Sequence, residues 1–401
     1  MKYLDCVVTS LAASALLGTT AANETVQIDE WEVPYHMEKG MVYDSPPTAQ
    51  QEETRPRDPW IDSQGRAWFA GQMGNYIAVL DPDSGEFERY ELSEGAHPHS
   101  LIIDAGDNVW YSGNLDSHIG KLDPATGRVW KFPTGDLGIQ DPHTMVWDRN
   151  GDIWFTAQHS TSIGKLTVTT GQFEVIKIRE RGARVYGIKL DSNGTPWVSL
   201  FGTNKILRVN PRSLEITEFL LPEGARPRRI VLTSDDVVWY TDYAQGQLGR
   251  LDPKTGEVRV WDSPGGRASI PYGIEVDAQD LLWYVESPLA KSNLVGFDTE
   301  IEEFLSVTPF GSGGRAVRHI HYHAPTNSIW MGTDANTIAR ARLPYGFRQL
   351  PGGKIVFKHD PLLRDEWLGD KPPARAQAHS WLWQDLANVE CPMLLLKGEE
   401  T

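Results

Sequence analysis

Short apolar runs alternate with turn residues along most of the chain. In residues 98–132 a Pro-His pair leads into the first of four such runs, at residues 101–103, 109–111, 119–122 and 129–132. Gly, Asn, Asp and Thr stand between the runs, and no helical period links them. This pattern predicts four short strands joined by tight turns, an antiparallel meander.

The same unit recurs along the chain. A tryptophan marks it at spacings of 42 to 47 residues, at Trp68, Trp110, Trp154, Trp197, Trp239, Trp283 and Trp330. A period in the forties with four strands per unit is typical of a β-propeller blade. The 15 tryptophans of the 401-residue chain suit packing between blades, so we interpret the repeated ones as core residues.

The ends of the repeat array predict how the ring closes. Residues 28–34 resemble the last strand of a blade, as in 87–92, yet they precede any first strand. The final repeat, 315–343, has three strand-like runs and lacks a fourth. We therefore predict an all-β fold, a seven-bladed β-propeller over residues 23–343, in which the N-terminal strand completes the seventh blade and removes the free edges.

The two termini differ in composition from the blades. Residues 1–22 combine Lys2, a short apolar run and small residues before Asn23, which predicts a signal peptide and a periplasmic or secreted protein. The apolar run is too short to span a bilayer. Its removal takes Cys6 and leaves Cys391 as the one cysteine, so no internal disulfide is expected.

Residues 344–401 form a separate C-terminal appendage without the blade pattern. Their Asp360-Pro361 stretch and the segment 389–400 resemble a late α/β segment of α/β-hydrolases. The chain contains no Gly-x-Ser-x-Gly sequence, the nucleophile motif of those enzymes. We therefore do not expect hydrolase activity from this segment.

The net charge of the chain excludes some classes of binding partner. A formal net charge of −16 argues against nucleic acid and anionic membranes. Propellers bind ligands where the loops before the innermost strands converge at the central channel. We therefore expect a monomer with a small-molecule ligand at the channel mouth.

A ring of polar residues is predicted at that mouth. Counting eleven residues back from each tryptophan gives a long polar or aromatic side chain in every blade. The residues are Arg57, His99, His143, Tyr186, Arg228 and Tyr272, with either Arg318 or His319 in the longer seventh blade. They fit a substrate-binding ring, or alternatively a solvent-facing rim without a ligand.

Two further groups are candidate metal ligands. Asp242 and Glu286 are the carboxylates among the residues three positions after each tryptophan, and together they could hold a hard divalent cation. Alternatively they form salt bridges to Arg228 or Arg318. His321 and His323 share one face of a strand and are either ligands or ordinary rim and core residues.

The repeat resembles the virginiamycin B lyase (streptogramin lyase) family over about residues 28–343. The resemblance is carried by Pro142-His143-Thr144-Met145, Trp154-Phe155-Thr156 and Ile163-Gly164-Lys165-Leu166. It implies a seven-bladed lyase that opens a cyclic depsipeptide ester by elimination. In that family a His removes the proton α to the carbonyl, and Mg²⁺ held by a Glu stabilises the enolate.

The family's catalytic motif is a Pro-His followed by Trp-Phe-Thr-Glu in the final blade, with another His one blade earlier. Here the final blade has Arg318-His319 and Thr333, and the blade before has Tyr272. The resemblance therefore implies His319 as the base and Glu286, with Asp242, for Mg²⁺. The rival hypothesis is a non-catalytic ligand-binding or scaffold propeller, and a requirement for a divalent cation distinguishes the two.

Overall fold

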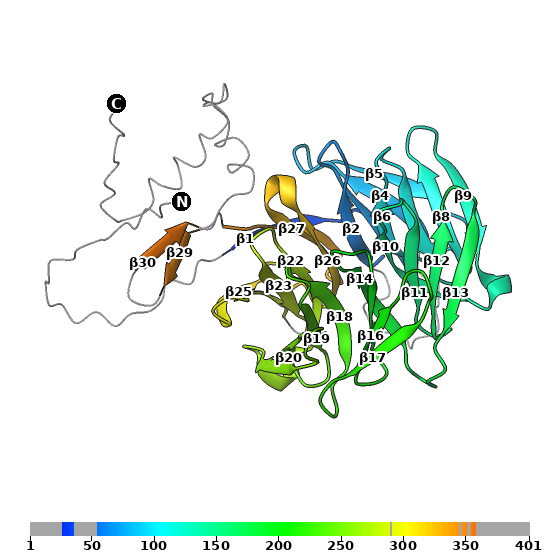
Figure 1. Ribbon diagram of the computed structural model, residues 1–401. Coiled ribbons are helices and arrows are strands. Elements are labelled where there is room, and N and C mark those ends of the chain that lie inside the picture. Colours follow the sequence, from blue (N-terminus) through cyan, green and yellow to red (C-terminus); the bar gives the residue numbers. More distant parts are fainter. Residues whose placement is uncertain (1–25, 36–53, 289–290, 345–346, 351–353, 358–401) are drawn as a thin grey trace, which may run out of the picture. The chain divides into compact units, whose positions relative to one another are not determined.

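The computed structural model describes residues 26–35, 54–288, 291–344, 347–350 and 354–357. Seven four-stranded antiparallel sheets follow one another along the chain and form the seven blades of a β-propeller (Figure 1). The predicted fold class is confirmed. Within the described ranges, helical structure is confined to the 3-10 turns η1 (Gly135–Leu137), η2 (Gly266–Ser269) and η3 (Ala324–Thr326).

Blades one to four use consecutive strands. Blade one contains β2 (Pro56–Ile61), β3 (Ala67–Gly71), β4 (Tyr76–Leu80) and β5 (Phe87–Glu91). Blade two contains β6 (Pro98–Ile103), β7 (Val109–Gly113), β8 (His118–Asp123) and β9 (Arg128–Pro133). Blade three contains β10 (Pro142–Trp147), β11 (Ile153–Ala157), β12 (Ser162–Thr167) and β13 (Gln172–Lys177). Blade four contains β14 (Val185–Leu190), β15 (Pro196–Leu200), β16 (Lys205–Val209) and β17 (Ile216–Leu220).

The later blades continue the pattern until the seventh. Blade five contains β18 (Pro227–Leu232), β19 (Val238–Asp242), β20 (Gln247–Leu251) and β21 (Val258–Asp262). Blade six contains β22 (Pro271–Val276), β23 (Leu281–Glu286), β24 (Asn293–Asp298) and β25 (Glu303–Pro309). Blade seven contains β26 (Val317–His323), β27 (Ser328–Thr333), β28 (Thr337–Arg342) and the N-terminal strand β1 (Gln27–Glu32).

The N-terminal strand closes the ring as predicted. β1 pairs antiparallel with β28 from Gln27 opposite Arg342 to Glu32 opposite Thr337. Trp31 stacks on Trp330 with ring centroids 5.8 Å apart. The Asp29 carboxylate accepts hydrogen bonds from Arg340 and Arg342 at 3.0 and 3.1 Å. The strand therefore binds the seventh blade through backbone, aromatic and ionic contacts.

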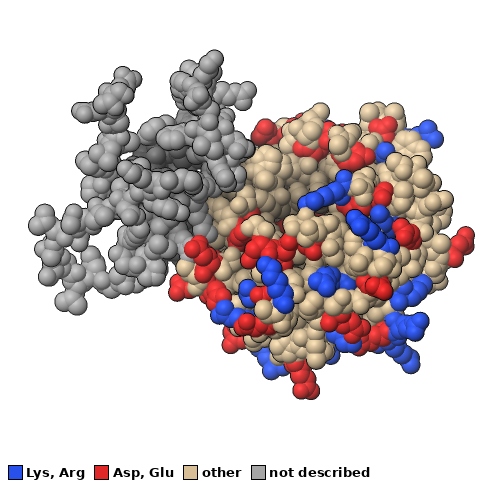
Figure 2. Space-filling model, in the orientation of Figure 1, with Lys and Arg blue, Asp and Glu red and all other residues tan. Residues whose placement is uncertain are grey.

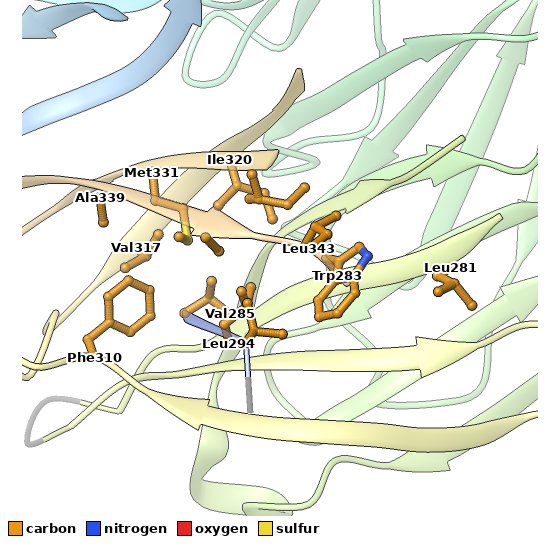
Figure 3. Packing of buried hydrophobic residues seen from close by; sticks show 13 residues of the cluster. Leu281, Trp283, Val285, Leu294, Phe310, Val317, Ile320, Met331, Ala339 and Leu343 are labelled. Carbon is orange, nitrogen blue, oxygen red and sulfur yellow. The ribbon is translucent and has the colours of Figure 1, made fainter. Parts of the chain in front are cut away.

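The repeated tryptophans are core residues, as their spacing predicts. All seven are at most 2% exposed. Figure 3 shows one cluster between blades six and seven, in which Trp283 lies near Ile320 and Leu343. Replacing a large buried aromatic by Ala costs about 3–5 kcal/mol, so these side chains are major contributors to stability. In four blades the tryptophan Nε1 also donates to an aspartate six residues earlier: Asp62, Asp104, Asp191 and Asp277.

A β-bulge interrupts the innermost strand of each blade. In β6, Pro98 pairs with Gly113 and Leu101 pairs with Tyr111, and the register shifts between them. The other six innermost strands show the same shift. Bulges re-aim side chains, and here they direct the second and third residues of the strand toward the centre of the ring.

Several predictions concern residues that are not described. The signal peptide, residues 1–22, lies outside the described residues, as does most of the appendage after residue 344. Within the appendage, β29 (Phe347–Leu350) and β30 (Lys354–Phe357) pair as an antiparallel hairpin. Across the described ranges, no helix has the length and apolar character needed to cross a membrane.

Candidate binding site at the polar ring

The second residue of each innermost strand contributes to a polar ring. In blade seven, Val317 pairs with Thr333 as Pro98 pairs with Gly113 in blade two. This register assigns the seventh position to Arg318, which resolves the choice between Arg318 and His319. The polar ring therefore consists of Arg57, His99, His143, Tyr186, Arg228, Tyr272 and Arg318.

Side chains of the polar ring meet across the channel axis. The rings of His99 and His143 have centroids 3.8 Å apart, and those of His143 and Tyr186 are 4.4 Å apart. The hydroxyls of Tyr186 in blade four and Tyr272 in blade six form a hydrogen bond. A contact between blades that are not neighbours requires both side chains to point at the axis. The polar ring is therefore a connected, inward-facing cluster, and a solvent-facing rim does not describe it.

Arg228 is surrounded by aromatic rings. Its guanidinium carbon lies 3.7 Å from the ring centroid of Tyr272 and 5.3 Å from that of Tyr186. Phe201 and Tyr243 add contacts at 4.5 and 4.3 Å. Cation–π attraction of this kind holds a guanidinium in place without neutralising its positive charge.

Sequence reasoning missed these partners although a signal exists. Phe201 and Tyr243 stand four residues after the tryptophans of blades four and five. The same position supplies Gln72, whose Oε1 accepts a hydrogen bond from Arg57 Nη1 at 2.5 Å. It also supplies Asp334, which binds both terminal nitrogens of Arg318, with Nη2–Oδ2 at 2.5 Å. An alignment that included the fourth residue after each tryptophan, one position beyond Asp242 and Glu286, would have found these four partners.

A deeper polar layer lies beneath the polar ring at the third residue of the innermost strands. Arg229 donates from Nη1 to Thr144 Oγ1 at 2.8 Å and from Nε to the carbonyl of Arg318 at 3.2 Å. Asp58, with a positive φ of 46°, lies with Oδ2 4.0 Å from Nδ1 of His319. Neither Asp58 oxygen has a hydrogen bond of ordinary geometry, although Ser100 is close enough to favour the carboxylate. The bulge, which the sequence did not reveal, brings this layer to the axis.

Burial and positive neighbours keep the histidines neutral. Burial lowers the pKa of His99 and of His143 well below the ordinary value, and the charges of Arg57 and Arg229 lower both further. The pKa of His319 is also well below its ordinary value, mainly through burial and then through Arg229. All three imidazoles are therefore unprotonated at neutral pH and can accept a proton.

The pKa values of the two tyrosines of the polar ring differ strongly. Burial alone would raise the pKa of Tyr186, but the charges of Arg228 and Arg229 outweigh burial and lower the pKa to about 8. Burial raises the pKa of Tyr272 to about 12, and negative charge on Tyr186 adds to the rise. The pair therefore gives up its first proton from Tyr186.

The channel below the polar ring is nearly filled. A cavity of about 40 Å³ remains, lined by residues that include Trp60, Lys189, Arg229 and His319. Pockets for drug-sized ligands are roughly 300–1,000 Å³, so this space suits water and a larger molecule does not fit below the polar ring. His319 thus lies one layer deeper than the polar ring.

His321 and His323 take structural contacts. His321 stacks on Trp60 with centroids 4.1 Å apart, and burial lowers its pKa to about 3. Nδ1 of His323 lies 2.7 Å from the hydroxyl of Thr326. These contacts fit the alternative of ordinary rim and core residues.

The family of the chain follows from its sequence. The family model described as the virginiamycin B lyase family matches residues 105–342, more than half of the 401 residues. The chain belongs to the virginiamycin B lyase family. A search of the curated proteins found no match.

Solved structures share the virginiamycin B lyase fold with this chain. A streptogramin B lyase structure is 22% identical with a TM-score of 0.68, covering 80% of this chain and 99% of its own. A catalytically inactive His-to-Ala variant of virginiamycin B lyase from Staphylococcus aureus, with quinupristin, is 23% identical with a TM-score of 0.67, covering 80% and 100%. The extracellular domain of a one-component system from B. thetaiotaomicron is 16% identical with a TM-score of 0.55, covering 76% and 44%. At these identities the likeness concerns the fold.

Glu286 and Asp242 do not fit the role of magnesium ligands that the resemblance to the virginiamycin B lyase family implies. Glu286 Oε1 accepts hydrogen bonds from the Ser263 hydroxyl at 2.7 Å and the Gly265 N–H at 2.6 Å, and Oε2 accepts one from Asn293 at 3.1 Å. Asp242 Oδ1 accepts three backbone N–H groups at 3.0 to 3.1 Å. Both carboxylates are about 1% exposed. They hold loops in place, and neither is salt-bridged to Arg228 or Arg318.

The described residues also lack a wider metal-binding cluster. No group of three or more His, Cys, Asp or Glu side chains in the described ranges has the geometry to hold a metal ion.

Proposed function

We propose that the protein binds a small molecule at the polar ring and opens an ester bond in that molecule by elimination. Membership of the virginiamycin B lyase family supports the reaction type. The observation that carries the proposal is His99, a neutral imidazole whose Nδ1 has no hydrogen-bond partner, within a ring of guanidinium groups. Export to the periplasm or the medium, supported by the apolar segment of residues 1–22, is part of the proposal.

His99 is suited to act as the general base. Burial keeps its imidazole unprotonated, and Nδ1, a buried atom without a hydrogen-bond partner, is the proposed acceptor of a C–H proton beside a carbonyl. When the base removes that proton, the ester C–O bond breaks and a carbon–carbon double bond forms. The electron pair of the broken bond goes to the departing carboxylate.

The arginines of the polar ring supply the complementary charge. Arg57 and Arg228 carry no salt bridge to a carboxylate within the described ranges, and fixed cations of this kind stabilise a carboxylate as it forms. His143, packed against His99, and Tyr186, packed against His143, orient the ligand. The base and the cations thus act from one ring.

His319 is the alternative base. Asp58 Oδ2, 4.0 Å from Nδ1 of His319, would stabilise the imidazolium after proton transfer. However, His319 lines the 40 Å³ cavity under the polar ring, which is too small for a depsipeptide. We therefore favour His99, since a ligand at the mouth reaches it first.

A non-catalytic binding propeller is the second candidate function. The observation that favours it is the set of hydrogen bonds that occupies Glu286 and Asp242. A propeller that uses the same polar ring only to hold a ligand would bind the small molecule and leave its ester intact.

The test is incubation with quinupristin followed by liquid chromatography and mass spectrometry. Elimination gives a linear isomer of unchanged mass with a new double bond, whereas hydrolysis adds one water. We expect the isomer. An intact ring with measurable binding would leave the binding function and contradict the lyase, and a hydrated product would contradict elimination.

A further inference from the structure

The polar ring and the layer beneath it carry an excess of positive charge. Four arginines converge there: Arg57, Arg228, Arg229 and Arg318. Two carboxylates, Asp58 and Asp334, accompany them. Asp334 is committed to Arg318 through a two-pronged ion pair. Asp58 lies in the deeper layer, where burial raises its pKa while the charges of Arg229 and Arg57 oppose that rise.

This excess contrasts with the rest of the chain. The formal net charge is −16, and Figure 2 shows acidic and basic side chains interspersed over the face drawn. A surplus of buried cations is costly unless a counter-charge accompanies it. The polar ring therefore has the charge balance of a site that takes an anion.

Arg57 illustrates the missing counter-charge. It is 6% exposed, and its Nε has no hydrogen-bond partner. Its one hydrogen bond among those described runs from Nη1 to the neutral amide of Gln72. Burial lowers the pKa of Arg57, and repulsion from the charge of Arg318 lowers it further. An anion between these two side chains would relieve that repulsion.

Arg228 provides a second cation held in place for a ligand. Its contacts with the rings of Tyr186, Tyr272, Tyr243 and Phe201 orient the guanidinium. Its Nε has no hydrogen-bond partner. A guanidinium that is already oriented loses little conformational entropy when it binds a planar oxyanion.

We infer that the polar ring is a binding site for an oxyanion group, such as a carboxylate or a phosphate, carried by the small-molecule ligand. Arg57 and Arg228 hold this group, because guanidinium pairs with oxyanions through short, charge-assisted hydrogen bonds. The inference rests on the proposed binding of a small molecule at the polar ring and specifies its chemical class. An ester substrate meets this requirement when its C–O bond breaks, because the departing group is then a carboxylate.

The test is calorimetric titration of the full chain with two oxyanions, succinate and inorganic phosphate, at constant ionic strength. Succinamide, which has the shape of succinate without its charge, is the matched neutral compound. We expect at least one oxyanion to bind and to raise the melting temperature, and succinamide to do neither. The tighter of the two oxyanions identifies the group. This comparison uses the unaltered protein and does not depend on the folding of a variant.

Variants then locate the site. Arg57→Gln and Arg228→Gln should each weaken oxyanion binding at least tenfold, because each removes a charge-assisted hydrogen bond. Arg212→Gln, in an exposed turn of blade four, is the matched control and should bind as the wild type does. Circular dichroism confirms that each variant is folded.

The outcomes separate this inference from the proposed function. Equal binding of succinate, phosphate and succinamide, no binding of either oxyanion, or equal weakening by Arg212→Gln would overturn the oxyanion site. The proposed function would still stand if quinupristin were converted. Conversely, oxyanion binding that needs Arg57 and Arg228, together with no conversion of quinupristin, would support the site and contradict the lyase.

Discussion

The imidazoles of His99 and His143 pack against each other at the channel axis, with centroids 3.8 Å apart and ring planes inclined by 39°. They come from neighbouring blades, β6 and β10, at the same position of the repeat. Two imidazolium ions at this distance would repel each other, and burial among arginines already disfavours their protonated forms. The pair is therefore stable as two neutral bases.

The N-terminal strand should be essential for the stability of the ring. Deleting residues 23–34 removes β1, exposes the edge of β28 and abolishes the Trp31–Trp330 stack. We expect a loss of stability on the order of 3 kcal/mol or more, measured as a lower melting temperature and faster proteolysis. Asp29→Asn is the control: it removes the partly exposed ion pairs to Arg340 and Arg342 and should cost no more than about 1 kcal/mol. A deletion variant with wild-type melting and protease resistance would refute closure by this strand.

Tyr186 should titrate far below an ordinary tyrosine. Its pKa of about 8 in the folded protein compares with about 10 in the unfolded chain. Because the folded state releases this proton first, its contribution to the free energy of unfolding grows from pH 8 to pH 10. The same contribution is lost as the pH falls through 8.

Ultraviolet difference spectroscopy of tyrosinate measures this titration. A phase near pH 8 should be present in the wild type and absent in Tyr186→Phe. Tyr111→Phe is the control, because burial raises the pKa of Tyr111 and its loss should leave that phase intact. Persistence of the phase in Tyr186→Phe would assign the low pKa to another group.

Glu286 should contribute to the stability of the fold and should not hold a metal ion. Glu286→Gln disturbs the hydrogen bonds from Ser263, Gly265 and Asn293, and should lower the free energy of unfolding by about 1–3 kcal/mol. Elimination by the wild type should proceed unchanged with a chelator. The exposed Glu257→Gln is the control and should leave the melting temperature unaltered. A turnover that stops with chelator and a variant that needs more Mg²⁺ would instead assign Glu286 to a metal.

The fold could be predicted because each blade repeats the same local rules. The tryptophan spacing, the turn residues and the misplaced strand at residues 28–34 together predicted seven blades and the way they close. Six ring positions followed from the same alignment. The seventh position stayed open between Arg318 and His319 because the seventh blade is one residue longer between the polar ring and the tryptophan.

The partners of the polar ring could not be predicted by the same route. Asp58 and Arg229 come to the axis through a β-bulge, a backbone feature that the apolar pattern does not encode. The hydrogen bonds of Glu286 depend on the loop at Ser263 and Gly265, which is more than twenty residues distant in the chain. Sequence spacing therefore found the positions of the cations and imidazoles, and the structure was needed to find what each one contacts.

The proposed role of His99 can be tested by comparing the initial rates of quinupristin elimination by the wild type, His99→Ala and His319→Ala, measured by mass spectrometry. If His99 is the base, its replacement should lower the rate about 100-fold or more, whereas His319→Ala should retain most of the activity. Circular dichroism should show that both variants keep the folded propeller. A wild type that forms no linear isomer, or a folded His99→Ala variant with the wild-type rate, would contradict elimination with His99 as the base.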